Sequence, residues 1–269
     1  MEMVNVEKLD YLINYLLEES GRSDKIPTDI IQKKKLYRAL VNIRMPKEID
    51  KKYLEIENEY LKEELEKEEI IDVNSLIPIN KKYPNTEILN KDKICIFQGD
   101  MTLLDCDAIV NPANSQGLGC FVALHNCLDN QIGSKAGVSL RLECNEKMKE
   151  KNYNLETGHA FITDGYNLKA KKIIHTVGPI IKFEVTEDDK EKLANCYINS
   201  LNIAIENNVR TIAFPCISTG LFRFPKDIAS KIAISVVDEF LSKNRDKFDK
   251  VVFSLYSDED VKIYEQNIR

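Results

Sequence analysis

Residues 108–119, AIVNPANSQGLG, run from a short apolar segment into a polar loop rich in turn-forming residues. Ala108-Ile109-Val110 is typical of a buried β-strand, and the asparagines and glycines that follow favour an irregular loop. Further short segments rich in β-branched residues also lead into polar or glycine-containing loops, at residues 94–97, 160–163, 172–176, 211–214 and 251–255. We predict a β-strand for each of them.

Amphipathic segments of helical period lie between or after these predicted strands, at residues 128–151, 187–208, 225–243 and 258–267. Strands separated by helices predict an α/β fold in which helices cover both faces of one sheet. Ligands of such folds bind at the carboxyl ends of the strands, where loops and helix N-termini meet. The polar loops that follow the strands are therefore the first place to look for a functional site.

The first 92 residues have a different pattern. Apolar residues at helical spacing predict a helix around residues 9–17, a second helix from Pro27 to Met45-Pro46, and a third, highly charged one over residues 49–69. The apolar face of the second helix is predicted to contain Ile30, Ile31, Leu36, Tyr37, Leu40 and Val41. We predict a helical extension and connector over residues 1–92, followed by the α/β domain over residues 93–269.

Composition limits the partners of the chain. A net charge of -6 argues against binding duplex nucleic acid by phosphate neutralisation. The sequence has no apolar run long enough to cross a bilayer, and its N-terminus does not resemble a secretion signal. The 7 cysteines are odd in number and mostly lie in apolar segments, which predicts reduced thiols in a cytoplasmic protein. We expect neither nucleic acid nor membrane as a partner.

Residues 119–130, GCFVALHNCLDN, place two cysteines and a histidine close together. Thiolates and imidazole are ligands that zinc prefers, and three protein ligands leave a coordination position open, as in catalytic zinc sites. Cys120, His125 and Cys127 are therefore candidate zinc ligands, although a chance cluster at a helix start is the alternative. Asp129 follows at the predicted helix start, where it could act as a general base, orient a ligand or complement the helix dipole.

Two other loops suit parts of a nucleotide. Asp100, in Gly99-Asp100-Met101-Thr102, could accept a hydrogen bond from an exocyclic amine such as that of adenine, or it could simply cap a turn. The asparagines of residues 111–119 suit sugar hydroxyls because each amide carries donors and an acceptor, but an ordinary surface loop would look similar.

Residues 215–225, PCISTGLFRFP, lead from a predicted strand into a predicted helix. Small residues before a helix can direct several N–H groups at a phosphate, and Phe222 and Phe224 could wall a sugar or a base. The alternative is a capped strand–helix connection. The chain has no Gly-Lys-Ser/Thr motif, so we expect no phosphoryl transfer here. His159 and His175 lie in or beside apolar strands, and we interpret both as hydrogen-bonded structural histidines.

Together these loops resemble those of the macrodomain family. The resemblance is carried by GDMT at residues 99–102, NPAN at 111–114, IHTVGP at 174–179 and STG at 218–220. Residues 119–130 look like the zinc-dependent branch of microbial macrodomains, the protein-ADP-ribose hydrolases, and residues 56–61 and 76–79 are similar to the helical N-terminal extension of that branch. The resemblance implies a three-layer α/β/α fold that holds ADP-ribose in a cleft.

The resemblance also implies roles for individual residues. In the cleft, Asp100 would bind the adenine amine with Met101 beside it, Asn114 would lie at the distal ribose, and Tyr256 would face adenine. The diphosphate would be held by Ser218, Thr219, Gly220, Leu221 and Phe222. Zn²⁺ would be bound by Cys120, His125 and Cys127, and Asp129 would be catalytic together with Asn114.

Three positions depart from the family pattern. Pro112 replaces an alanine, Gly133 stands where a histidine often follows Ile132, and Arg223 stands where the phosphate loop commonly has glycine. The implied activity is zinc-assisted removal of ADP-ribose from protein carboxylates. The alternatives are a reader that binds ADP-ribose without cleaving it, and an O-acetyl-ADP-ribose deacetylase. The zinc-dependent branch is associated with a sirtuin-like transferase and a lipoylated carrier protein, which would be the modified substrate.

Overall fold

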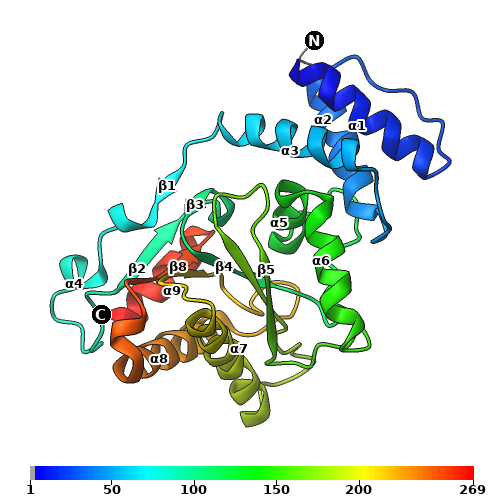
Figure 1. Ribbon diagram of the computed structural model, residues 1–269. Helices are drawn as coiled ribbons and strands as arrows, with labels where there is room; N and C mark the ends of the chain where they lie inside the picture. The colour runs from blue at the N-terminus through cyan, green and yellow to red at the C-terminus, as the bar shows by residue number, and fades with distance from the viewer. Residues whose placement is uncertain (1–3) are drawn as a thin grey trace.

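A computed structural model describes residues 4–269 and contains a central, mixed β-sheet (Figure 1). The sheet has 6 strands in the order β2-β8-β7-β4-β6-β5. The strands are β2 (Ile94–Gln98), β4 (Ala108–Pro112), β5 (Ala160–Asp164), β6 (Lys172–Thr176), β7 (Thr211–Phe214) and β8 (Lys250–Leu255). Neighbouring strands are parallel except β5, which pairs with β6 in the antiparallel direction. The predicted strands are confirmed.

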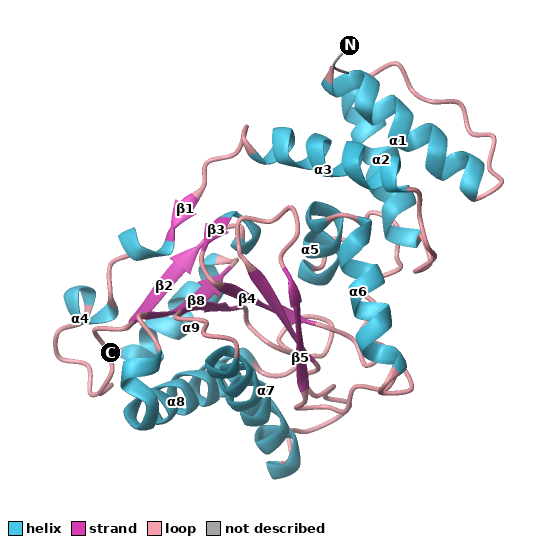
Figure 2. Cartoon of the chain, viewed as in Figure 1, coloured by secondary structure: helices cyan, strands magenta, loops and turns pink. Residues whose placement is uncertain are grey.

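Helices cover both faces of the sheet (Figure 2). One face packs against α7 (Glu187–Glu206), α8 (Lys226–Asn244) and α9 (Asp258–Ile268), and the other against α5 (Leu128–Ala136) and α6 (Val138–Lys149). Successive residues of a strand point to opposite faces. Accordingly, Ala108 and Val110 belong to the first hydrophobic cluster and Ile109 to the second. The three-layer α/β/α architecture is therefore as predicted.

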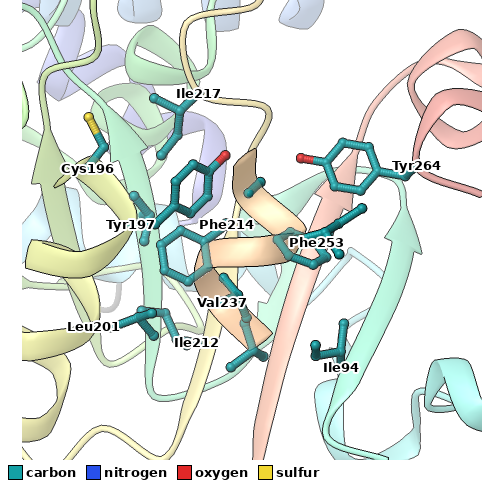
Figure 3. Close-up of a cluster of buried hydrophobic side chains, with 14 of the residues drawn as sticks. Ile94, Cys196, Tyr197, Leu201, Ile212, Phe214, Ile217, Val237, Phe253 and Tyr264 are labelled. Carbon is teal, nitrogen blue, oxygen red and sulfur yellow. The ribbon is translucent and has the colours of Figure 1, made fainter. Parts of the chain in front are cut away.

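Aromatic side chains fill the core beneath α7, α8 and α9 (Figure 3). The rings of Tyr197 and Phe214 lie 5.1 Å apart, and those of Phe253 and Tyr264 lie 5.2 Å apart. Each buried aromatic ring removes a large apolar surface from water. This core fixes β7 and β8, and hence the loops that leave their carboxyl ends.

The predicted helix over residues 128–151 is two helices, because the chain turns at Gly137 between α5 and α6. Gly137 has a φ of +91°, which favours glycine. A Cβ at this position would lie 2.7 Å from Oε2 of Glu57, which comes from the N-terminal extension. Both the backbone conformation and the close approach of Glu57 therefore require glycine at this break.

The N-terminal extension consists of α1 (Asn5–Glu19), α2 (Ile30–Ile43) and α3 (Lys51–Leu65), and it lies beside α5 and α6 (Figure 1). The three helices share a hydrophobic cluster that includes Tyr37, Leu40 and Val41 of α2 and also Val138 of α6. Ile30 is 38% exposed and Ile31 is 60% exposed, so their predicted places on the apolar face of α2 are wrong. The apolar residues of α2 that join the cluster with α1 and α3 lie further along the helix, at Tyr37, Leu40 and Val41.

The connector packs against the sheet. It contains β1 (Ile71–Asp72), η1 (Val73–Ser75) and α4 (Ile79–Lys82), and β1 pairs with β3 (Leu104–Asp105). Nζ of Lys250 donates to the carbonyl oxygens of Val73, Asn74 and Leu76, at 3.0, 2.6 and 2.7 Å. Two further short helices are η2 (Met101–Leu103) and η3 (Arg245–Lys247). The domain boundary at residue 92 stays a prediction.

Across residues 4–269, none of the helices combines the length and the apolar character that crossing a membrane requires.

Candidate functional site

The loops singled out in the sequence lie at one edge of the sheet. They follow β2, β4, β6, β7 and β8, which run in the same direction, so all leave from carboxyl ends. The loops after β6 and β7 are in contact, since the amide of Ile181 donates to the carbonyl of Phe222 at 2.8 Å. A Cβ at Gly178 would lie only 1.9 Å from Oγ of Ser218, so this approach requires glycine. The edge is where α/β folds bind ligands.

Asp100 lies at the start of this edge, after β2, and caps η2. Its carboxylate accepts hydrogen bonds from the amide and the hydroxyl of Thr102, at 2.9 and 2.6 Å, and from Nζ of Lys135 at 2.7 Å. Burial alone would raise the pKa of Asp100, but the bonds from Lys135 and Thr102 outweigh it, and the pKa is lowered. The carboxyl therefore stays ionised as an acceptor. Met101 has its side chain in the core, at 3% exposure, which leaves its main chain for contact with a ligand.

Tyr256 follows β8 directly beside the Asp100 loop. Gln98 of β2 is in register with Leu255 of β8, and the amide of Gly99 donates to the carbonyl of Leu255 at 3.1 Å. Tyr256 is 77% exposed, so most of its ring is open to solvent. An exposed aromatic ring next to an ionised acceptor suits a nucleobase, which needs one surface for stacking and one partner for its amine.

The loop after β7 presents main-chain donors. Among the described residues, the amides of Gly220, Leu221 and Phe222 donate no hydrogen bond, while Arg223 and Phe224 donate back to the carbonyls of Gly220 and Ser218. Consecutive free amides before a helix start suit a phosphate or diphosphate. Thr219 stabilises the turn, since its hydroxyl donates to the carbonyl of Cys216 at 3.0 Å.

The side chains of this loop differ in how far they are exposed. Phe224 is 1% exposed and belongs to the hydrophobic core, so its predicted role as a wall for a sugar or base is wrong. Phe222 is partly exposed and Leu221 is 75% exposed, so both remain available at the surface. Ser218 has a φ of +65° and a buried hydroxyl oxygen without a partner among residues 4–269.

The asparagine loop after β4 holds the glycine-rich segment that follows it. Nδ2 of Asn114 donates to the carbonyl of Gly119 at 3.1 Å, and its Oδ1 accepts from the amide of Gln116 at 3.0 Å. A side-chain amide has two N–H groups and two acceptor sites. Asn114 is only partly buried, so the remaining donor and acceptor can reach a sugar hydroxyl.

Asp129 is a buried carboxylate with a defined partner. It lies in the first turn of α5, is 8% exposed, and accepts a hydrogen bond from Nδ2 of Asn111 at 2.7 Å. Burial raises the pKa of Asp129, although Asn111 and the nearby Arg141 oppose the shift. A cavity of about 20 Å³, room for about one water molecule, lies against Asp129, Gly119, Arg141 and His175. This cavity is distinct from the phosphate loop after β7.

Asn111 links Asp129 to His175. Its Nδ2 lies 3.1 Å from Nδ1 of His175, and Nε2 of the same ring lies 2.9 Å from Oγ1 of Thr163. Burial lowers the pKa of His175 to about 3, so the ring is neutral and can accept from Asn111 at Nδ1. The structural interpretation of His175 is confirmed. His159 has 62% of its side chain exposed and lies near Glu156, so the same interpretation is wrong for His159.

The three candidate zinc ligands come together. One donor atom each of Cys120, His125 and Cys127 lies within 4.8 Å of the other two, and Sγ of Cys120 is 3.7 Å from Nδ1 of His125. Two sulfurs and one imidazole at this separation fit a zinc ion with an open position. Burial raises the pKa of the Cys127 thiol to about 11. A bound cation would favour its thiolate.

Arg141 is a residue of this region that the sequence did not reveal. From α6, its guanidinium donates to the carbonyls of Leu118 and Cys120 at 2.9 and 3.1 Å, and it lies 4.2 Å from the ring centre of Phe121. It also bonds main-chain carbonyls of the N-terminal extension. No motif marks Arg141, since its partners are carbonyl groups that any sequence supplies.

Comparison with known proteins agrees with this geometry. Residues 110–233 match the Macro domain family. The chain is 39% identical over 265 residues to a protein-ADP-ribose hydrolase of Staphylococcus aureus (strain COL), covering 97% of this chain and 95% of the relative. A protein-ADP-ribose hydrolase of Treponema medium is 40% identical over 264 residues, covering 97% and 98%.

A solved structure is similar as well. The Trypanosoma brucei macrodomain in complex with ADP-ribose superimposes with a TM-score of 0.66 at 26% identity, covering 86% of this chain and 95% of that one. The relatives in Staphylococcus and Treponema match over nearly the whole chain, including the N-terminal extension. The chain therefore belongs to the macrodomain family.

Proposed function

We propose that this protein is a hydrolase that removes ADP-ribose from ADP-ribosylated proteins. The observation that carries the proposal is the position of Asp129. This buried carboxylate is held by Asn111 at the same edge of the sheet as the free amides of residues 220–222. A candidate diphosphate site and a candidate general base therefore lie at the same edge of the sheet. The hydrolase names of the full-length relatives agree with this assignment.

We propose that Zn²⁺ is bound by Cys120, His125 and Cys127. The donor set and its spacing fit zinc, and Asp129 lies in the first turn of the helix that Cys127 caps. When bound, zinc would supply a Lewis acid able to polarise a hydroxyl of the distal ribose or a water molecule.

The substrate would be held along the loop edge by the chain itself. Asp100 would accept the adenine amine, and Tyr256 would lie against the base. The loop from Ser218 to Phe222 would bind the diphosphate through the free amides of residues 220–222, and Asn114 would bind the distal ribose. These contacts would fix the anomeric carbon relative to Asp129, and such positioning removes much of the entropic barrier of a reaction.

The proposed reaction is hydrolysis of the ester that joins an Asp or Glu side chain of the acceptor to the anomeric carbon of the distal ribose. Asp129 would orient one water molecule or take its proton. The ester is cleaved with addition of that water, and the products are the free acceptor carboxylic acid and ADP-ribose. A raised pKa suits this role, because a general base works best when its pKa approaches the operating pH.

We propose as acceptor a lipoylated carrier protein modified by a sirtuin-like transferase, and the cytoplasm as location. The acceptor rests on the resemblance of residues 119–130 to the zinc-dependent branch. The location rests on the free thiols. The proposed reaction does not depend on either the acceptor or the location.

The test uses a protein acceptor that a transferase has modified on carboxylates. We expect the wild-type protein to release ADP-ribose, and Asp129→Ala to release it at least about a hundredfold more slowly while still binding it. Asp246→Ala is the control, since that carboxylate is exposed on η3 and lies outside the loop edge. Binding of ADP-ribose without any release would favour the reader. Cleavage of O-acetyl-ADP-ribose but not of the modified protein would favour the deacetylase.

A further inference from the structure

We propose that helix α2 of the N-terminal extension is a structural part of the metal site, with Arg38 and Asn42 as its positioning residues. This inference rests on the proposed zinc site of Cys120, His125 and Cys127. It adds that the ligand loop, residues 120–127, takes its shape from contacts outside the macrodomain.

Two side chains of α2 hold the ligand loop directly. Oδ1 of Asn42 accepts a hydrogen bond from the amide of Leu124 at 3.0 Å, and Nη2 of Arg38 donates to the carbonyl of His125 at 2.8 Å. Residues four apart on a helix lie on the same face, so Arg38 and Asn42 approach the loop together. Asn42 thus binds the N–H group of the residue before the imidazole ligand, and Arg38 binds the carbonyl group of the ligand residue itself.

The same two side chains tie the loop to α5. Arg38 also donates to Oδ1 of Asn130 at 2.7 Å, and Nδ2 of Asn42 donates to Oγ of Ser134 at 2.9 Å. Asn130 in turn donates to the carbonyl of Val122 at 2.9 Å, within the loop. The contacts form a closed set that joins α2, the ligand loop and α5, so the loop cannot shift without breaking several of them.

The asparagines that make these contacts are buried, whereas the loop residues Val122 and Leu124 are 59% and 42% exposed. Asn42 is 2% exposed and Asn130 is 1% exposed. A buried polar group loses solvation that a correctly placed partner restores, so the buried amides of Asn42 and Asn130 favour the loop geometry that supplies their partners. Leu124 has a φ of +56°, an uncommon conformation for a residue with a side chain, and its amide is the group that Asn42 binds. Asn42 therefore stabilises a turn that the loop does not favour by itself.

The first ligand is linked to the extension by another route. Arg141 donates to the carbonyl of Cys120 at 3.1 Å and to the carbonyls of Val41 and Asn42 of α2 at 3.0 and 2.8 Å. Both the start and the end of the ligand loop are thus connected to α2. Partners of metal ligands orient them and tune the affinity of the site.

The test measures zinc affinity of the full-length protein by competition with a chromophoric chelator. Arg38→Ala and Asn42→Ala remove the direct contacts to the loop, and we expect each to weaken zinc binding by about tenfold to a hundredfold. Lys33→Ala is the matched control. Lys33 is also on α2 and pairs with Asp10 of α1 at 2.7 Å, but it has no contact with the loop. It should perturb the packing of the extension and leave zinc affinity unchanged.

A second measurement separates positioning from general destabilisation. Hydrogen exchange of residues 120–127 in the metal-free proteins should show faster exchange at Leu124 in Asn42→Ala than in the wild type or in Lys33→Ala. If Arg38→Ala does not fold, Arg38→Lys serves instead. It keeps the charge and loses the planar fork, and it should still bind zinc more weakly than the wild type.

The outcomes are distinct. Weaker zinc binding in the Arg38 and Asn42 variants, with wild-type affinity in Lys33→Ala, supports the inference. Equal affinity in all these proteins, or an equal loss in Lys33→Ala, overturns the role of α2 and leaves the zinc site standing. A wild-type protein that binds no zinc overturns both the metal site and this inference.

Discussion

Nδ2 of Asn111 donates a hydrogen bond to Oδ1 of Asp129 at 2.7 Å, and the same nitrogen lies 3.1 Å from Nδ1 of His175. One amide group thus holds a candidate catalytic carboxylate on one side and a neutral, buried imidazole on the other. The imidazole stacks on the ring of Phe161, with ring centres 4.6 Å apart, and this fixes its plane. The orientation of Asp129 is therefore built into the sheet through β4 and β6.

The first prediction concerns Asn111→Ala. The substitution removes the donor to Asp129 and leaves His175 without its partner at Nδ1, which should cost about 1–3 kcal/mol of the free energy of unfolding. We expect the rate of ADP-ribose release to fall at least about tenfold, because Asp129 loses its orientation. The affinity for ADP-ribose should change little, since the diphosphate loop is untouched. Single-turnover release and calorimetric binding measure the two effects, and an unchanged rate would contradict the positioning role.

The second prediction concerns Gly178, where the loops after β6 and β7 touch. In Gly178→Ala the new Cβ would meet Oγ of Ser218 at 1.9 Å and Cγ2 of Ile217 at 2.9 Å, so the phosphate loop must move. We expect ADP-ribose affinity to fall about tenfold or more, because the free amides of this loop are displaced from the diphosphate.

Gly165→Ala is the control for that experiment. Its Cβ would lie 1.8 Å from the carbonyl oxygen of Ala170, in the turn between β5 and β6, so it should also destabilise the fold. It should leave ADP-ribose affinity near that of the wild type. Equal losses of affinity in both variants would show that Gly178 acts only through stability.

The third prediction concerns the pH dependence of stability through Glu57. Its carboxyl is buried at the contact of α3 with α6, where it accepts from the hydroxyls of Tyr37 and Tyr53 at 2.7 and 3.1 Å and from the amide of Val138 at 2.9 Å. Burial raises the pKa of Glu57 above its ordinary value of 4.5, although these hydrogen bonds oppose the rise.

The folded state therefore binds a proton at Glu57 that the unfolded state releases as the pH rises above 4.5. The stability that this proton provides is present below that pH and is lost as the pH rises through the higher, folded-state pKa. Denaturant unfolding of the wild type and of Glu57→Gln across this range should show the wild type losing stability relative to the variant as the pH increases. A difference that stays constant, or that grows with pH, would contradict the raised pKa.

The strands and the loop edge could be predicted because their signals are local. Runs such as Lys172–Thr176 and Thr211–Phe214 contain β-branched residues, and each leads into glycine and polar residues. The candidate ligands Cys120, His125 and Cys127 were also recognisable, since all lie within one short segment. Their close approach follows from that spacing together with the turn between them.

Long-range contacts account for what the sequence did not reveal. Glu57 lies so close to Gly137 that a side chain would not fit at the break between α5 and α6, and these two residues are distant in the sequence. Phe222 and Phe224 have similar neighbours in the sequence. Only the packing of α8 on the sheet shows that Phe224 is buried. The role of Arg38 likewise cannot be recognised from a sequence motif, because its partner is the main-chain carbonyl of His125, a group that every residue has.

The most direct test of the account is to measure zinc content and ADP-ribose release on the same samples of wild type and His125→Ala. Elemental analysis should give about one zinc per wild-type chain and little in the variant, because one of three protein ligands is removed. Release of ADP-ribose from the modified acceptor should fall sharply in the variant and in wild-type protein treated with a chelator. A metal-free His125→Ala protein that releases ADP-ribose at the wild-type rate would contradict the proposed role of this site.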